Sequence, residues 1–356
     1  MCIQIDKEEF CLGTNRKEHI NMIGSKILTI IVPSYNTEKY MDECLPSFLD
    51  ERILDDLEVL LINDGSKDRT EEVAKKYQER YPNTIRLINK ENGGHGSVIN
   101  RGIKEARGRY FKVIDGDDWV ITENLVKLVQ ELKLINVDLV LNPYKIYHIA
   151  RKKYYTINLP MDCVGRVKSF DEIANRLGRI QLHMITYNTE LIRQSGVRVR
   201  ENCYYEDAEY GLFYIPYIQD VAILEDAVYV YRIGSSEQSV NVKNVIRNET
   251  MALLIEDDII SFYQKLPNKI TEEKRKYIIR YIKSVINGNY SLYLKMNFSK
   301  AARKRLYDYD DAFKGKSKEL YENTSSLAIK LIRTKTWISY AIAHVAFWMK
   351  MKIRGY

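Results

Sequence analysis

The chain has 356 residues, of which 45% are hydrophobic and 29% charged, a composition that is typical of a folded protein and excludes a disordered chain. The net charge of +7 is uneven, because residues 295–356 carry 14 basic and 5 acidic side chains while the remainder is slightly acidic. The five cysteines are scattered without a C-x-x-C pair, which disfavours a disulfide framework or a zinc site and fits a reducing cytosol.

Residues 1–25 precede the first predicted strand and are mixed and charged, without the apolar stretch of a signal peptide. We expect them to form a loose N-terminal extension. After this extension, the change of pattern near residue 240 predicts two regions, an α/β domain over 26–240 and a helical region over 241–356.

Short apolar runs alternate with helix-like stretches over the first 145 residues. This order is typical of βαβ units, and the continuous apolar strands indicate a mostly parallel sheet with helices on both faces. In such sheets, ligands bind at the carboxyl ends of the strands. The strands are predicted at 27–32, 58–62, 84–88, 110–114 and 138–142, and the helices at 38–50, 68–81, 96–106 and 122–134.

Three polar clusters fall at predicted strand ends: "PSYNTE" (33–38), "NDGSKD" (63–68) and "DGDDW" (115–119). The last contains Asp115, Asp117 and Asp118, and carboxylates are the ligands that Mg²⁺ and Mn²⁺ prefer. Magnesium shares its coordination shell with substrate phosphates, so few protein ligands are needed. The alternative is a solvated loop that caps the helix starting near 122. The position at a strand end favours the metal site.

The Gly-rich segment "ENGGHGSVINRG" (91–102) enters a predicted helix, a place where backbone N–H groups can bind an anion. It has neither the lysine of a P-loop nor a G-x-G-x-x-G turn in the first crossover. A P-loop and a dinucleotide-binding fold are therefore both disfavoured.

Beyond residue 145 the pattern is less regular. Helices are predicted in "KSFDEIANRL", "NTELIRQSG" and "EDAEYGLFYIPYI", and two short strands around a turn in "VAILEDAVYVYRI". From 244 onward the pattern is helical, at about 244–266, 271–295, 299–322 and 326–351. The uncharged run over 336–349 is too short to span a bilayer.

Together, "TIIVPSYNTEKYMDECLPSFL", "LEVLLINDGSKDRT" and "NGGHGSVINRGIKEARGRYFKVIDGDDW" resemble the family-2 glycosyltransferases with a GT-A fold, of the bacterial polysaccharide and cell-surface glycan type. The match is close over 27–125 and looser over 180–240. It implies a UDP-sugar, or less often another nucleotide-sugar, at the strand ends. By motif, the nucleotide-sugar-binding residues would be Pro33, Tyr35, Asn36, Glu38, Asp64, Asn92, Asp115, Asp118 and Arg232.

The resemblance also implies individual roles. Asp64 would accept a hydrogen bond from the base, Asp115 would face the ribose or the sugar, and Asp117 would bind the Mg²⁺ or Mn²⁺ that bridges the diphosphate. One departure stands at 98–100, where many relatives read A-R-N and this chain reads V-I-N. An arginine that could hold the nucleotide is thus replaced by Ile99, and His95 enlarges the difference.

The looser part of the match contains the pair Glu206-Asp207 at the start of a predicted helix. Inverting transfer needs a base within hydrogen-bond reach of the acceptor hydroxyl, and the resemblance gives that role to Asp207. The alternative is two acids favoured by the helix macrodipole. Arg232 is expected at the diphosphate, or else as an exposed arginine on an edge strand. The sequence leaves two assignments open. His183 could face the acceptor or be packed under a loop. The tyrosines could belong to the core, to an edge strand or to a platform for a sugar, and they are those at 144, 147, 154 and 155.

The predicted function is metal-dependent, inverting transfer of a sugar to a hydroxyl of a glycan or lipid-linked saccharide. A nucleotidyltransferase is the first alternative, but it would need a basic Gly-rich loop after the first strand. An inactive sugar-nucleotide-binding membrane adaptor is the second, and the acids at 115, 117 and 207 argue against it. No segment resembles a base-reading module, so nucleic acid is not an expected partner.

The tail predicts a membrane-surface helix. Residues 337, 340, 341, 344, 345 and 348 fall on one helical stripe, with basic residues on both sides. Such a helix suits an anionic cytoplasmic leaflet, and we expect a cytoplasmic protein held peripherally on the inner face of the membrane. The alternative is a terminal helix that packs this stripe on the preceding helices.

Overall fold

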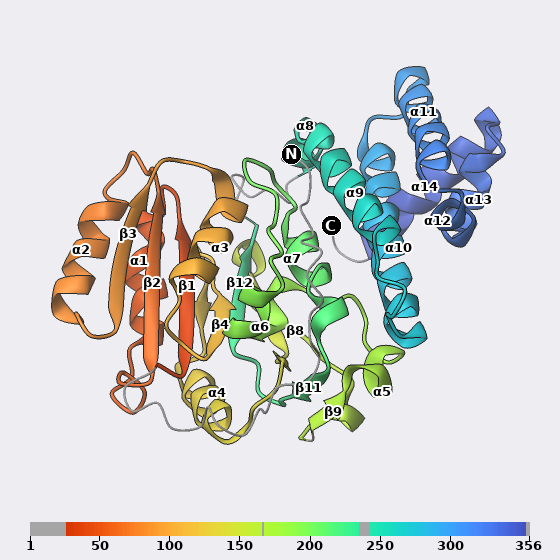
Figure 1. The fold of residues 1–356 in the computed structure, drawn as a ribbon. Helices are drawn as coiled ribbons and strands as arrows, with labels where there is room; N and C mark the ends of the chain where they lie inside the picture. The colour runs from red at the N-terminus through yellow and green to blue at the C-terminus, as the bar shows by residue number, and fades with distance from the viewer. Residues whose placement is uncertain (1–25, 166, 235–241, 354–356) are drawn as a thin grey trace. The chain divides into compact units, whose positions relative to one another are not determined.

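The computed structural model describes residues 26–165, 167–234 and 242–353, and Figure 1 shows their fold. The chain divides into two compact units, residues 1–234 and residues 235–356. The predicted N-terminal extension lies outside the described residues, and so do residues 235–241, which contain the predicted boundary at 240. Each unit is described by itself below.

The first unit is built on an eight-stranded sheet in the order β3-β2-β1-β4-β10-β6-β11-β9. Strands β1 to β4 are parallel to one another, and β10 and β9 are antiparallel to their neighbours. Every residue of β1 and β2 is buried, so both faces of the sheet are covered, as predicted. The strands are β1 (Leu28–Ser34), β2 (Leu57–Asp64), β3 (Ile85–Lys90), β4 (Tyr110–Val113), β6 (Leu139–Leu141), β9 (Val167–Ser169), β10 (Ile185–Asn188) and β11 (Asp220–Ile223).

The helices of this unit follow the predicted order. The stretch predicted as one helix over 38–50 stops being α-helical at Cys44 and continues as a 3-10 turn, because Pro46 has no N–H to donate. Helix α5 begins at a capping box made by Ser169 and Glu172. The helices are α1 (Glu38–Cys44), α2 (Thr70–Arg80), α3 (Gly94–Glu105), α4 (Thr122–Leu134), α5 (Phe170–Ala174), α6 (Thr189–Gln194) and α7 (Asp207–Leu212).

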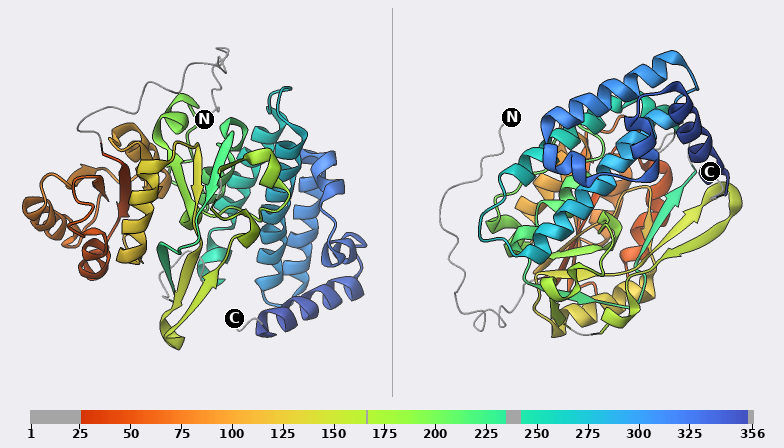
Figure 2. Two further views of the ribbon diagram at one scale, coloured as in Figure 1. Left: turned by 90° about the horizontal axis from the view of Figure 1, so that it is seen from below. Right: turned by 90° about the vertical axis from the view of Figure 1, so that its right-hand side faces the viewer.

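A second, four-stranded sheet has the order β5-β12-β7-β8, with bounds β5 (Trp119–Val120), β7 (Tyr144–His148), β8 (Lys153–Ile157) and β12 (Tyr229–Ile233). Strands β7 and β8 form an antiparallel hairpin that extends from the body of the first unit, in yellow-green in Figure 2. The sequence analysis did not predict this hairpin. The two strands predicted around the turn in 221–233 do form, but β11 joins the first sheet and β12 the second.

The second unit is all-helical, as predicted. One polar group inside it is well satisfied: Asp310, which is fully buried, contacts Tyr290, Tyr321 and Arg333. The helix predicted over 244–266 is divided at Asn248, and that over 299–322 at Ser317. The helices are α8 (Val242–Arg247), α9 (Glu249–Gln264), α10 (Glu272–Lys295), α11 (Lys300–Lys316), α12 (Lys318–Asn323), α13 (Leu327–Arg333) and α14 (Trp337–Ile353).

Helix α14 does not present the predicted stripe as one surface. Tyr340 and His344 are buried, and both rings pack on Phe298 at 5.1 Å between centroids. Tyr340 and His344 therefore follow the alternative, in which the stripe packs on the protein, because Phe298 of the loop between α10 and α11 covers them. The exposed apolar face keeps three residues of the stripe, Trp337, Val345 and Trp348, and adds Ile338, Ile342 and Met349. Within the described residues, no helix has both the length and the apolar character needed to cross a bilayer.

Candidate active site

The acid cluster lies directly after β4, at the edge where parallel strands β1, β2 and β4 end. Asp118 is buried, and its carboxylate accepts hydrogen bonds from the Tyr229 hydroxyl at 2.6 Å and from the backbone N–H of Arg232 at 2.7 Å. Burial, together with the charges of Asp117 and Asp115, raises the pKa of Asp118 well above its usual range. The sheet edge thus concentrates negative charge, as the sequence predicted.

Asp117, like Asp118, has no ion-pair partner among the described residues, whereas Asp115 is paired with His95. The nearby Arg232 guanidinium instead contacts the backbone carbonyl of Asp117 at 2.8 Å and the Glu43 carboxylate at 2.5 Å. Burial and the charge of Asp115 raise the pKa of Asp117 to about 6. Its anion is therefore destabilised until a positive group approaches, which is the electrostatic setting of a metal ligand.

Arg232 is held in place rather than exposed on an edge strand. Its guanidinium stacks over the rings of Trp119 at 4.5 Å and Tyr40 at 5.2 Å, in addition to the two contacts above. The side chain is 12% exposed. The predicted contact with a diphosphate stays a prediction.

His95 connects two parts of the site that are far apart in sequence. Its Nε2 lies 2.8 Å from Asp115 Oδ1, and its Nδ1 lies 2.5 Å from Glu206 Oε1. Burial lowers the pKa of His95, but the two carboxylates outweigh this and raise it well above its usual range. The ring is thus an imidazolium that donates from both nitrogens. The sequence analysis did not name His95 as a site residue, although it noted that the chain departs from its relatives there.

Asp207 is the first residue of α7, next to Glu206. Its carboxylate is 45% exposed and lies 3.6 Å from the Arg179 guanidinium. The pKa of Asp207 is raised, because desolvation by the surrounding protein and the charge of Glu206 together outweigh the opposing charge of Arg179. An accessible carboxylate with a raised pKa is suited to accept a proton near neutral pH.

Asp64 has an internal role in the structure. Its buried carboxylate accepts from Lys90 Nζ at 2.5 Å and from the backbone N–H groups of Gly93 and Gly94 at 3.0 and 2.8 Å. The Asn92 side chain, which is exposed, donates to the Asp64 carbonyl at 2.8 Å. Asp64 and Asn92 therefore fix the Gly-rich turn that begins α3, and the predicted contact of Asp64 with a base is untested.

The residues after β1 join the turn that follows β2. The Asn36 side chain accepts from the Lys67 backbone at 2.8 Å, and Glu38 accepts from the Arg69 backbone at 2.6 Å. Pro33 is buried in β1, whereas the Tyr35 ring is 48% exposed and is available to stack on a flat ligand.

His183 completes a group that can hold a metal ion. One ligand atom each of Asp115, Asp118 and His183 lies within 4.8 Å of the others. Burial lowers the pKa of His183 to about 4, so the ring is neutral, and its buried Nδ1 has no hydrogen-bond partner among the described residues. The ring packs against Tyr144, Tyr229 and Tyr231. A neutral imidazole beside two acids fits Mn²⁺ or Mg²⁺, whereas Asp117 is not part of this particular group.

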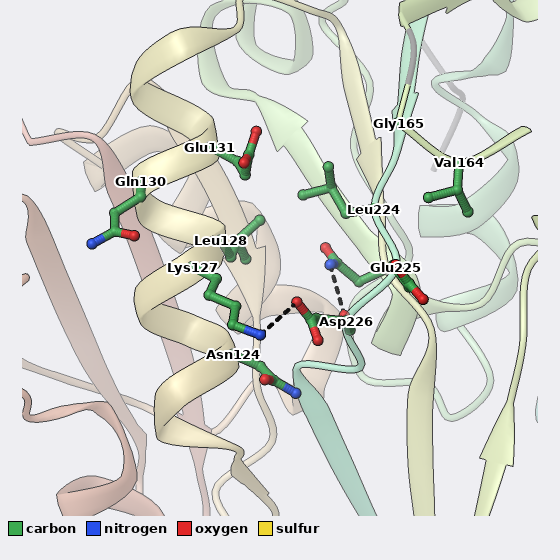
Figure 3. Close-up of a pocket in the computed structure, with 11 residues that line it drawn as sticks. Asn124, Lys127, Leu128, Gln130, Glu131, Val164, Gly165, Leu224, Glu225 and Asp226 are labelled. Atoms are coloured by element: carbon green, nitrogen blue, oxygen red, sulfur yellow. Dashed lines mark hydrogen bonds and ion pairs between the residues drawn. The ribbon is translucent and has the colours of Figure 1, made fainter.

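A cavity of about 350 Å³ lies apart from these residues, between α4 and the segment after β11. Figure 3 shows Lys127 and Asp226 pointing toward each other there, with 3.1 Å between the charged atoms. None of the predicted site residues lines the cavity. The candidate active site is therefore the open acid cluster and not this cavity.

Gly96 controls how closely α3 approaches the segment before α7. A Cβ at this position would overlap the carbonyl oxygen of Arg200 and touch the Glu206 side chain at 3.1 Å. We expect Gly96→Ala to destabilise the fold by about 1–3 kcal/mol and to lower turnover by displacing Glu206 and Asp207. Gly288→Ala, in the middle of α10 with open space around it, is the matched control and should be neutral or slightly stabilising. Thermal unfolding and a turnover assay of both variants measure this, and equal behaviour of the two would contradict the close approach.

The sequence was compared with protein families and curated relatives. Residues 29–199 match the family described as "Glycosyl transferase family 2". The Bacillus subtilis protein "Uncharacterized glycosyltransferase EpsJ" is 31% identical over 214 residues, which cover 58% of this chain and 61% of that protein. The B. subtilis "Minor teichoic acid biosynthesis protein GgaB" is 29% identical over 216 residues, 59% of this chain and 23% of that protein. The chain thus spans less than two thirds of these relatives.

Solved structures share the fold over most of the chain. The crystal structure of Staphylococcus aureus TarS 1-349 in complex with UDP-GlcNAc has a TM-score of 0.64 at 18% identity and covers 91% of this chain and 92% of its own. The mannosyltransferase PcManGT from Pyrobaculum calidifontis, in complex with GDP-Man and Mn²⁺, has a TM-score of 0.51 at 16% identity. The superposition covers 89% of this chain and 86% of PcManGT. At these identities, the similarity shows the fold.

Proposed function

Residues 29–199 form a glycosyl transferase family 2 domain with a GT-A fold, and on this premise we propose that the chain is a metal-dependent inverting glycosyltransferase. The donor is a nucleotide-sugar, in the first place a UDP-sugar, and the acceptor is a hydroxyl of a glycan or a lipid-linked saccharide. The observation that supports the proposal is the bridge that His95 makes between Asp115 and Glu206, because it links the acid cluster after β4 to the start of α7, where Asp207 lies.

The nucleotide would lie over the ends of β1 and β2. Tyr35 supplies an exposed ring for the base, and the turns held by Asn36, Glu38 and Asp64 shape the pocket floor. The N-terminal turn of α3 supplies backbone N–H groups for phosphate, although Asp64 already uses those of Gly93 and Gly94.

In the proposed transfer, Asp207 takes the proton of the acceptor hydroxyl while its oxygen forms a bond to the anomeric carbon. The bond from that carbon to the diphosphate oxygen breaks on the opposite side, and the electron pair leaves with the nucleoside diphosphate. The Arg179 guanidinium lies 3.6 Å from the Asp207 carboxylate and orients it. Glu206 is fixed by His95, so that α7 begins at a defined distance from the donor side.

A divalent cation fits the acid cluster on two observations. Asp117 lacks an ion-pair partner among the described residues and has a raised pKa, and His183 offers a neutral ring next to Asp115 and Asp118. Asp117 is the residue proposed to hold the metal, with Asp115 and His183 close enough to assist. When bound, Mg²⁺ or Mn²⁺ neutralises the diphosphate and stabilises its developing charge.

The proposed function is tested by nucleotide release with Mn²⁺, a panel of UDP- and GDP-sugars and saccharide acceptors, followed by analysis of the product linkage. We expect one donor to give acceptor-dependent release with inversion at the anomeric carbon. Release of pyrophosphate from a nucleoside triphosphate would instead identify a nucleotidyltransferase. Nucleotide-sugar binding without any turnover would identify an inactive adaptor.

We further propose that the second unit holds the enzyme on an anionic membrane surface. The exposed face of α14 is apolar, with a tryptophan at each end. Residues 327–353 contain no acidic residue, and among their basic residues Lys330, Lys350 and Lys352 are exposed. Arg333 and Lys335 are instead paired with Asp310 and Asp311. Each basic residue near an anionic surface contributes on the order of 1 kcal/mol, so several together suit peripheral binding. A lipid-linked acceptor would be reached at the same surface.

Liposome co-sedimentation of the full chain tests this binding. Vesicles with phosphatidylserine should retain the protein at low salt, neutral vesicles should not, and added salt should release it. The variant Ile342→Gln/Val345→Gln/Met349→Gln removes exposed side chains and should weaken binding by about tenfold or more. Leu134→Gln, which removes an exposed leucine of α4 in the first unit, is the control. If the triple variant sediments like the wild type, α14 is not the membrane contact.

A further inference from the structure

The β7–β8 hairpin combines exposed tyrosines with a strongly one-sided charge. Between Asp138 and Asp162 the chain has no acidic residue, whereas it has four basic ones, namely Lys145, Arg151, Lys152 and Lys153. Tyr154 and Tyr155 of β8 are 55% and 44% exposed. Cross-strand packing accounts for part of the Tyr154 ring, and the exposed surface of both rings beside positive charge is suited to a ligand.

The strand register connects this hairpin to the candidate active site. Tyr231 of β12 pairs with Ile146 of β7, and Ile146 pairs with Tyr155 of β8. Directly paired residues lie on the same face of a sheet, so these three side chains form one row across the strands. With adjacent strands roughly 5 Å apart, the row reaches about 10 Å from Tyr231.

The inner end of this row borders the reacting groups. The Tyr231 ring lies 4.5 Å from the His183 ring, and burial together with the charges of Asp118, Asp115, Asp117 and Asp207 raises the pKa of its hydroxyl. A chain that lies along the row would therefore have one end at Tyr231, beside His183, and its outer part at Tyr155 and the basic hairpin tip.

The other face of the hairpin carries a second aromatic row. Arg232 pairs with Tyr147, and Tyr147 pairs with Tyr154, whose ring lies 4.9 Å from that of Tyr147. Trp119 extends this row, with its ring 5.7 Å from that of Tyr147. Both faces of the hairpin thus offer flat surfaces for sugar rings beside positive charge.

We propose that the β7–β8 hairpin binds the acceptor and that the acceptor is an anionic glycan, a saccharide chain that carries carboxylate or phosphate groups. The tyrosines stack on the sugar rings, and Arg151, Lys152 and Lys153 contact the anionic groups. This inference rests on the proposed function, because it names the acceptor class of the same site. Aromatic and basic residues together can also bind single-stranded nucleic acid, so the test includes one.

The probe is polygalacturonate, compared with its fully methyl-esterified form, which has the same sugar rings without the charge. Binding to the full chain is measured by titration at low salt in the presence of UDP and Mn²⁺. We expect polygalacturonate to bind and the methyl ester to bind at least about tenfold more weakly. The variant Arg151→Gln/Lys152→Gln/Lys153→Gln should lose about tenfold in affinity for polygalacturonate. Tyr154→Thr/Tyr155→Thr should weaken binding of both polymers, because it removes the stacking surface.

The matched control is Lys75→Gln/Lys76→Gln/Arg80→Gln, which removes the same charge from the exposed face of α2. Equal loss in both charge variants, or binding of oligo(dT) as tight as that of polygalacturonate, would mean general polyanion attraction and overturn the proposal. Equal binding of the two polymers by the wild type would also overturn it. Donor hydrolysis without acceptor separates the two claims: if the wild type hydrolyses the donor but does not bind polygalacturonate, the hairpin inference fails and the glycosyltransferase proposal stands.

Discussion

Asp207→Asn is expected to lower the rate of the chemical step by about 10²-fold or more while leaving the KM for the nucleotide-sugar little changed. The amide keeps the size of the carboxylate and its place at the start of α7, but it cannot accept a proton at neutral pH. Single-turnover measurement with a saturating donor separates this step from binding. The expectation depends on the accessible carboxylate and its upward pKa shift.

Two controls distinguish a base from an acid that merely stabilises a helix. Glu190→Gln removes a charge from the first turn of α6, another six-residue helix, and should cost only about 0.3–1 kcal/mol in the free energy of unfolding. Glu206→Gln should also impair activity, through the lost contact with His95. If Asp207→Asn turns over like the wild type, the base lies elsewhere, and if the product retains the anomeric configuration, single displacement is excluded.

Asp117→Asn should remove most activity, by about 10²-fold, and should weaken Mn²⁺ binding by about tenfold or more. The fold should be unaffected, because in the structure the Asp117 carboxylate holds no ion pair with another described residue. EDTA should abolish transfer by the wild type, and Mn²⁺ or Mg²⁺ should restore it. Titration with Mn²⁺ alone gives a readout that does not depend on the donor.

Asp226→Asn is the control, because it also removes one carboxylate charge. Asp226 lies beside Lys127 and lines the separate cavity next to α4. It should keep both Mn²⁺ affinity and turnover. Full turnover in EDTA would contradict the metal role. Normal Mn²⁺ affinity in Asp117→Asn, together with its loss in His183→Gln, would move the metal to the Asp115, Asp118 and His183 group.

The part of the fold that local patterns determine was predicted well. Strands β1 and β2 are buried throughout, and the polar residues that end them lie close together because parallel strands share an edge. The β7–β8 hairpin was missed, because its tyrosines and lysines have neither an apolar period nor a Gly-containing turn. Its Lys152 instead takes the left-handed conformation, with φ of 50°.

The contacts that complete the site depend on residues far apart in sequence. His95 and Glu206 are separated by 111 positions, and no local pattern indicates that they meet. The departure from relatives at 95–96 was the available signal, since Gly96 lets α3 approach Arg200 closely enough for that contact. The orientation of α14 could not be decided from the sequence for the same kind of reason, because Phe298, which is distant in sequence, determines which side of the helix is buried.

The imidazolium of His95 divides its hydrogen bonds between Asp115, which is proposed to face the donor, and Glu206, which precedes the proposed base Asp207. A ligand that engages Asp115 competes for one of these bonds and so changes the free energy with which the ring holds Glu206. Thermodynamic linkage then requires that occupancy of the acceptor side changes donor affinity by the same factor. The affinity for each substrate would thus depend on whether the other is bound, through the single side chain of His95. A variant without the His95–Glu206 hydrogen bond would bind the two substrates independently.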